Sequence, residues 1–485
     1  MRLTPVFALA SLAICGLDAR GVEQNLWPFY ASEKDAAGNV TEWQAGGPLV
    51  FGKEQADGRA GGVRPFYVWK EKRAGGRTQS SLLYPLLTYR TDASGSSWNV
   101  FSIIRSSTPK PGVSDRYHSL DFWPFYFSRR TGDPAASYRA LFPVAGAVKN
   151  RFGQDKWSWV FFPLYGRFEK NNVVTTTAPW PFVKVMRGQD NHGVELWPLF
   201  GYRYKDGAYR EQYYIWPLIY KQEHALWAPQ PEVKLGVLPF YTRDQSAHSI
   251  SESYLWPFFG YTDRTAPDRY HETRYFWPFL VQGRGDRHTV NRWGPFYTHS
   301  VFKGRDKTWV AWPLWRQIRW DDSGLEQTKT TVLYFLYGSL TQQSLAHAEH
   351  PPARRTTLWP LFTMWDNGAG RRQVEVLSPL ESFFPSNETV RLAYSPLFAI
   401  YRYDRRAPDS VRQDFLFNFV SWQRSPNRKE FHLGPLFKME KSPGTASVSL
   451  LDGLIGLRHG PAGRGWRPFA FDFSPKTPTS ELTSR

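Results

Sequence analysis

Hydrophobic and polar residues alternate along most of this 485-residue chain, in short runs that are separated by turn-forming residues. The runs from Tyr202 to Lys205 and from Phe469 to Phe473 have the period of two that is typical of a β-strand. No long segment has the apolar spacing of an amphipathic helix. Turn sequences lie between the runs, at Asp206-Gly207, Thr131-Gly132-Asp133, Ala266-Pro267-Asp268, Gly285-Asp286 and Asn367-Gly368. The pattern predicts an all-β protein.

One apolar phrase recurs through the chain: an aromatic residue or Leu, then Trp-Pro, then Leu or Phe, then Phe or Tyr. Aligned on its proline, the phrase occurs about 24 times between Pro28 and Pro468, with a repeat of about 19 residues; a few copies lack the proline, and others fall on Pro379 and Pro396. The clearest copies contain Trp197, Pro198, Trp216, Pro217, Trp256, Pro257, Trp277, Pro278, Trp312, Pro313, Trp359 and Pro360.

Each repeat is long enough for one strand of about 9–13 residues and a turn, with the Trp-Pro phrase near the middle of the strand. The chain is therefore predicted to form an antiparallel up-and-down meander of about 24 strands. Open twisted sheets rarely exceed about 10 strands, so we expect this meander to close into a large barrel. The alternative is a stacked β-hairpin repeat, in which every Trp-Pro phrase is a corner.

The prolines decide between these two architectures. Proline donates no hydrogen bond to a neighbouring strand, and the carbonyl that loses its donor costs about 1–3 kcal/mol. About twenty such losses exceed a usual net stability of about 5–15 kcal/mol, so the prolines must lie in bulges or bends. If Pro257 and Pro278 belong to a bulged belt around a closed sheet, the barrel prediction holds. If they are corners between hairpins, it fails.

The ends of the chain differ from the repeat. Residues 1–19 have the basic start and apolar centre of a signal peptide, and Leu12 to Cys15 resembles a lipobox, so Cys15 is a possible lipidation site. Residues 20–473 are predicted to form a single β-repeat or barrel domain, and 474–485 a polar C-terminal tail. The segment from Trp466 to Phe473 resembles the last strand by which bacterial barrels are recognised for assembly.

Composition and charge suggest a location and partners. A mean hydropathy of −0.50 with 21% charged residues excludes an α-helical membrane protein. Cys15 is the only cysteine, so a large exported chain without disulfides fits a bacterial envelope. The net charge of +18 is scattered along the chain, which disfavours nucleic acid as a partner. We expect outer-membrane lipids or lipopolysaccharide as partners, and anionic solutes as a further class of partner.

No recognised catalytic motif occurs in the chain. The closest group of metal-ligand residues, His347-Ala348-Glu349-His350, lies in the longest insertion and is interpreted as a polar loop with incidental histidines. We therefore predict that the protein is not an enzyme and has no catalytic residues, cofactor or metal.

The tandem Trp-Pro-Leu/Phe-Phe/Tyr phrase resembles that of bacterial envelope proteins built from the same repeat. The resemblance covers nearly the whole chain and implies a location and an architecture, without an activity. We expect a non-enzymatic outer-membrane β-barrel that is channel-like or an envelope scaffold. The alternative is a soluble periplasmic or surface β-hairpin repeat protein, or one lipid-anchored at the envelope, that binds polysaccharide or protein.

Overall fold

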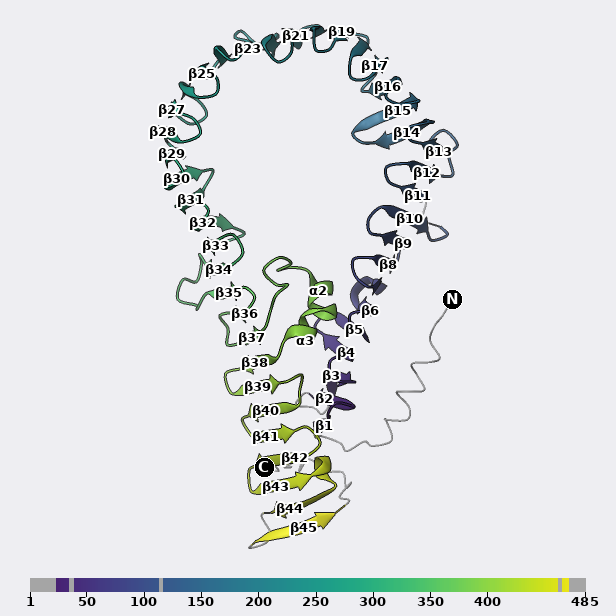
Figure 1. The fold of residues 1–485 in the computed structure, drawn as a ribbon, viewed down its shortest axis with the longest axis vertical. Helices are drawn as coiled ribbons and strands as arrows, with labels where there is room; N and C mark the ends of the chain where they lie inside the picture. Colours follow the sequence, from purple (N-terminus) through teal and green to yellow (C-terminus); the bar gives the residue numbers. More distant parts are fainter. Residues whose placement is uncertain (1–22, 35–38, 113–116, 461–464, 471–485) are drawn as a thin grey trace, which may run out of the picture. The chain divides into compact units, whose positions relative to one another are not determined.

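The computed structural model describes residues 23–34, 39–112, 117–460 and 465–470. The expected signal peptide, Cys15 and the polar tail 474–485 lie outside the described residues. The described chain is all-β and follows an antiparallel up-and-down course (Figure 1). It divides into two compact units, unit 1 within residues 1–84 and 353–485, and unit 2 within 85–352.

Unit 1 contains two runs of strands, in which each strand pairs antiparallel with its neighbours in sequence. They are β1 (Gln24–Leu26), β2 (Tyr30–Lys34), β3 (Val40–Ala45), β4 (Val50–Gln55), β5 (Gly58–Val63), β6 (Tyr67–Lys72), β7 (Thr78–Leu82), β35 (Ala353–Leu358), β36 (Phe362–Asp366), β37 (Arg372–Val376), β38 (Tyr401–Ala407), β39 (Ser410–Phe415), β40 (Val420–Ser425), β41 (Arg428–Leu433), β42 (Phe437–Ser442), β43 (Thr445–Leu450), β44 (Ile455–His459) and β45 (Trp466–Ala470).

Unit 2 is one continuous meander. Its strands are β8 (Leu87–Asp92), β9 (Gly95–Val100), β10 (Ile104–Pro109), β11 (His118–Phe122), β12 (Tyr126–Arg130), β13 (Tyr138–Leu141), β14 (Ala145–Arg151), β15 (Gln154–Val160), β16 (Tyr165–Lys170), β17 (Val173–Thr177), β18 (Val183–Arg187), β19 (Asn191–Leu196), β20 (Phe200–Lys205), β21 (Tyr209–Tyr214), β22 (Ile219–His224), β23 (Glu232–Val237), β24 (Tyr241–Ser246), β25 (Ser249–Tyr254), β26 (Phe259–Arg264), β27 (Tyr270–Phe276), β28 (Leu280–Gly285), β29 (His288–Trp293), β30 (Tyr297–Phe302), β31 (Arg305–Val310), β32 (Trp315–Asp322), β33 (Leu325–Val332) and β34 (Tyr337–Ser344).

The Trp-Pro phrases form tight turns between strands. In the turn between β27 and β28, the N–H of Phe279 donates to the carbonyl of Phe276 at 2.8 Å, and Pro278 follows a cis peptide bond at the third position. This is the position that proline occupies in a type VI β-turn. Strand pairing resumes at once, with Phe276 opposite Leu280. The proline therefore lies where the strand pairing requires no donor.

Successive Trp-Pro turns are joined by backbone hydrogen bonds. The N–H of Trp277 donates to the carbonyl of Phe258 in the preceding turn at 2.7 Å, and the N–H of Leu255 donates to Phe240 at 2.7 Å. Equivalent bonds recur along the chain, so at most of these corners the carbonyl after the proline receives a donor from the next turn. The backbone groups at these corners are thus satisfied within the protein.

The prediction of about 24 long strands closed into a barrel is wrong. The described residues form 45 strands, because each expected strand is divided in two at its Trp-Pro corner. In the described chain, β1 pairs only with β2 and β45 only with β44, so the first and last strands do not join. The all-β class and the antiparallel meander are confirmed, and the corners required by the hairpin alternative are present.

The repeat is interrupted between β37 and β38. Copies of the phrase were expected at Pro379 and Pro396, but this segment contains the helices α2 (Glu388–Ala393) and α3 (Ser395–Phe398). Asn387 begins α2, because its side chain accepts a hydrogen bond from the N–H of Val390 at 3.2 Å. The prediction of strands at Pro379 and Pro396 is wrong, because the helix cap at Asn387 and tertiary packing outweigh the local sequence pattern.

These helices cover one face of β4–β6. Leu392 and Ala393 pack against Phe51, Ala60 and Val68, and all five side chains are buried. Side chains of β2 and β3 form ion pairs with β38, and a side chain of β1 donates a hydrogen bond to β40, so unit 1 contains two packed layers (Figure 1). The opposite face of β3–β6 remains open.

Unit 2 has no second layer of strands over its described sheet. Aromatic rings lie flat on the sheet instead, above glycines of the adjacent strand. A Cβ atom at Gly201 would lie 2.1 Å from the ring of Tyr213, and one at Gly236 would lie 2.1 Å from the ring of Tyr220. The members of each pair face one another in the strand register. Rings placed in this way shield backbone that a second layer would otherwise cover.

We predict that Gly236→Ala destabilises unit 2 locally, because the added methyl group displaces the ring of Tyr220. Overpacking of this kind typically costs about 1–3 kcal/mol. Hydrogen exchange should accelerate in β22 and β23 and stay unchanged in β29 and β30, since repeats contact only their neighbours. Gly132→Ala is the control, because a Cβ atom there meets nothing within 4 Å. If hydrogen exchange in β22 and β23 were equally fast in Gly236→Ala and in Gly132→Ala, the ring of Tyr220 would not be packed on Gly236 as described.

Candidate functional site

The Trp-Pro turns of unit 2 form a continuous apolar rim, here called the Trp-Pro rim. It consists of the turns at residues 123–125, 142–144, 161–164, 178–182, 197–199, 215–218, 238–240, 255–258, 277–279, 294–296, 311–314 and 333–336. None of these turns contains a charged residue. Their large side chains are exposed: Phe240 is 65% exposed and Phe296 is 74% exposed. An exposed apolar array of this extent is typical of an interaction surface.

The repeat residues singled out in the sequence lie at corners. Each Trp-Pro pair among them occupies a turn with a cis peptide bond, at Trp197-Pro198, Trp216-Pro217, Trp256-Pro257, Trp277-Pro278, Trp312-Pro313 and Trp359-Pro360. The first five belong to the Trp-Pro rim, and their indoles are exposed. Trp359 lies in unit 1, where its Nε1 donates to the carbonyl of Pro379 at 3.0 Å. The same Trp-Pro phrase is therefore exposed on the rim of unit 2 and hydrogen-bonded to a neighbouring segment in unit 1.

The opposite rim of unit 2 is polar. Its turns contain Lys205-Asp206, the segment 265–269, Asp286-Arg287 and Lys303-Gly304. Arg287 and Asp268 form an ion pair across this rim at 2.8 Å. The single-layer sheet thus has one aromatic rim without charged residues and one rim whose turns contain most of the turn charges.

Unit 1 contains a buried ionic cluster that the sequence did not reveal. Arg412 lies between three carboxylates: it pairs with Glu23, with Glu33 at 3.0 Å and with Asp414 at 3.1 Å. All four side chains are less than 10% exposed. Glu23 and Arg412 are separated by 389 residues, so no local pattern indicates their contact.

The carboxylates of this cluster have unequal acidities. Burial raises the pKa of Glu23 to about 7, although the charge of Arg412 opposes this shift. Burial also raises the pKa of Asp414. Burial alone would raise the pKa of Glu33, but the charges of Arg412 and Arg406 outweigh it and lower that pKa. The cluster joins the two layers of unit 1, and its charges are paired with one another, so we assign it to structure.

A second buried carboxylate, Glu381, lies beside the helices. Its Oε1 accepts a hydrogen bond from the Ser395 hydroxyl at 3.0 Å, and the Nε of Arg391 is 3.9 Å away. Its Oε2 is buried and has no hydrogen-bond partner among the described residues. Burial raises the pKa of Glu381 to about 7, with the nearby charge of Arg391 opposing the shift.

The loop after β34 brings His347, Glu349 and His350 together. One possible ligand atom from each lies within 4.8 Å of the others. The three side chains are 63–69% exposed. Exposed groups of this kind are common on protein surfaces without a bound ion.

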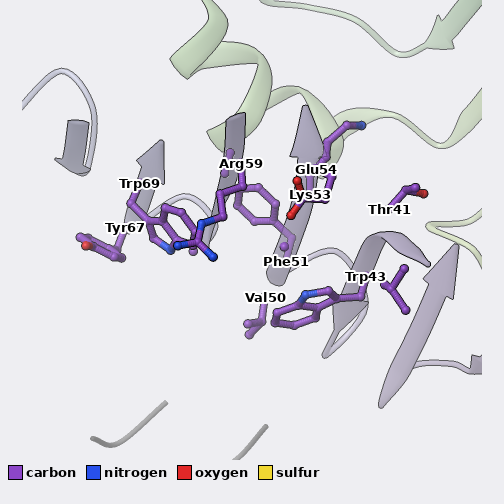
Figure 2. A pocket seen from close by; sticks show the side chains of 13 residues that line it. Thr41, Trp43, Val50, Phe51, Lys53, Glu54, Arg59, Tyr67 and Trp69 are labelled. Atoms are coloured by element: carbon purple, nitrogen blue, oxygen red, sulfur yellow. The ribbon is translucent and has the colours of Figure 1, made fainter. Parts of the chain in front are cut away.

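The open face of β3–β6 contains a hollow of about 340 Å³ between two indoles (Figure 2). Trp43 and Trp69 lie at its two sides, and the lining includes Thr41, Arg59 and Tyr67. The sequence repeat gave no indication of this hollow, because Trp43 and Trp69 stand within strands and outside the Trp-Pro phrase.

Comparison with protein-family models and with curated proteins finds no match to this chain. In the described part of the chain, no helix combines the length and the apolar character that membrane crossing requires.

We predict that Glu381→Gln stabilises unit 1 at alkaline pH. The folded-state pKa of about 7 exceeds the ordinary value of 4.5, so the folded protein binds this proton more tightly than the unfolded chain does. The wild type then loses stability as the pH rises from about 4.5 to about 7, by up to about 3 kcal/mol.

Urea denaturation at pH 4 and at pH 8 measures the effect of this substitution. The Gln variant should match the wild type at pH 4 and exceed it at pH 8. Glu349→Gln, on an exposed loop, is the control and should change stability at neither pH. If the Gln variant had the same stability as the wild type at both pH values, burial would not destabilise the ionised Glu381 carboxylate.

Proposed function

We propose that this protein is a non-enzymatic envelope scaffold that binds an anionic lipid surface through the Trp-Pro rim. The observation that carries this proposal is the segregation of unit 2 into an uncharged aromatic rim and a charged rim. Trp and Tyr are enriched at membrane–water interfaces, because their rings are apolar and carry one polar group. A row of such turns fits the shallow layer between lipid headgroups and acyl chains.

The charge of the chain supports an anionic surface. The formal net charge is +18, and the described basic residues of unit 2 lie on strands and on the polar rim, outside the turns that would insert. Basic residues close to an anionic bilayer are attracted to it over about a Debye length, whereas inserted turns avoid the cost of burying charge. Outer-membrane lipids, or lipopolysaccharide with its anionic groups, have this chemistry.

The proposal does not include a channel. The first and last described strands do not pair, so the described sheet does not close on itself. Binding would instead be repetitive: every turn adds a small apolar contact, and the backbone hydrogen bonds between turns hold these contacts in one row. The combined affinity then grows with the number of turns in contact.

We predict that replacing two turn tips weakens vesicle binding. In the full chain, Phe240→Ser combined with Phe296→Ser should lower partition into phosphatidylcholine–phosphatidylglycerol vesicles about ten-fold, because each side chain loses part of about 1.5–3 kcal/mol of apolar burial. Vesicle co-sedimentation measures this partition. Binding should also weaken in high salt and on pure phosphatidylcholine.

The matched control is Trp227→Ser combined with Leu345→Ser. These side chains are 79% and 52% exposed, but they lie in turns on the polar rim. The control should bind vesicles as the wild type does. Equal losses in the two double variants, or no loss in the rim variant, would overturn the proposal that the Trp-Pro rim contacts lipid.

A further inference from the structure

The hollow of unit 1 has an unusual floor. Trp43, Gly52, Gly61 and Trp69 face one another in register across β3, β4, β5 and β6. Both inner positions are glycine, and both outer positions are tryptophan. A Cβ atom at Gly52 would lie 2.3 Å from the indole of Trp43, and one at Gly61 would lie 3.0 Å from that of Trp69. The two indoles therefore lean inward over a backbone floor that has no side chains.

Contacts on both faces of these strands support this arrangement. Tyr30 stacks on Trp43 with ring centroids 6.5 Å apart and an interplanar angle of 22°. On the opposite face of the same strands, Phe51 and Ala60 are buried against the helix α2. A binding site supported in this way keeps its geometry without a ligand, which lowers the entropy lost on binding.

The charged residues of the hollow are already paired. On the open face, Arg59 pairs with Glu71 and Glu54 pairs with Arg73, each at 2.8 Å. The guanidinium of Arg59 also lies 5.9 Å from the centre of the Trp69 ring. Paired charges offer hydrogen bonds but no excess of either sign, which favours a neutral, hydroxyl-rich ligand over an anion or a metal cation.

We propose that the hollow between Trp43 and Trp69 binds a neutral saccharide. A pyranose ring has a face of polarised C–H groups, which packs on the electron-rich face of an indole. Its hydroxyl groups lie around the ring, where the Arg59 guanidinium, the Glu54 carboxylate and the Thr41 hydroxyl can bind them. A mainly apolar site with a few placed polar groups and a volume above about 300 Å³ is typical of small-molecule binding. This proposal is independent of lipid binding, since the Trp-Pro rim belongs to unit 2.

The test uses the full chain and three neutral hexasaccharides: maltohexaose, cellohexaose and chitohexaose. Saturation-transfer NMR should show transfer from aromatic protons to the ring C–H protons of at least one of them. Calorimetric titration with that sugar should show at least a ten-fold weaker affinity for Trp43→Ala and for Trp69→Ala, with Trp69→Phe partly retaining binding. No transfer to any of the three sugars would overturn the proposal.

Two further variants separate binding from folding. Trp422→Ala removes an exposed indole of unit 1 that lies outside the hollow, and it should bind the sugar as the wild type does. Arg59→Gln changes a side chain that is 60% exposed, so it should keep the fold, as circular dichroism can check, and still lose affinity several-fold. Unchanged affinity in a folded Arg59→Gln variant, or a loss in Trp422→Ala equal to that in Trp43→Ala, would contradict the assignment.

Discussion

The backbone hydrogen bond between successive Trp-Pro turns is the interaction on which the rest of this fold depends. Proline removes a donor wherever it occurs, and at a corner the strand pairing loses nothing by it. The next turn then donates to the carbonyl that follows the proline, as Trp277 does to Phe258. This hydrogen bond joins each repeat to the one before it. The corner also ends the strands on either side of it. Short strands and a narrow sheet follow from this single constraint.

A narrow sheet without a second layer must cover its own faces, which explains the composition of the chain. Tyr220 lies over Gly236 and Tyr213 over Gly201, so one large ring and one missing side chain together replace a packing partner. The same device gives a different result in unit 1, where Gly52 and Gly61 are neighbours and the rings of Trp43 and Trp69 approach from both sides. Placing an aromatic ring over a glycine of the adjacent strand therefore covers the sheet in unit 2 and forms a hollow in unit 1.

The sequence predicted the repeat, the antiparallel course and the polar turns, because these depend on neighbouring residues. It did not predict that each repeat holds two strands, since alternation continues on both sides of a three-residue corner and resembles one longer strand. A signal was present: the polarity of the two faces reverses between the phrases at Trp197 and at Trp277. Contacts such as Glu23–Arg412 and the packing of α2 on β4–β6 join distant segments, and no local pattern indicates them.

The buried charges of unit 1 bear on how its N-terminal and C-terminal strands choose one packing arrangement. Similar hairpins offer many equivalent ways for the N-terminal and C-terminal strands to pack. Arg412 fits only where Glu23, Glu33 and Asp414 converge, and any other placement leaves a buried charge unpaired, which costs about 3–5 kcal/mol. Such a cluster adds little net stability, because desolvation offsets most of the attraction. We infer that its contribution is selection of one packing register among near-identical repeats.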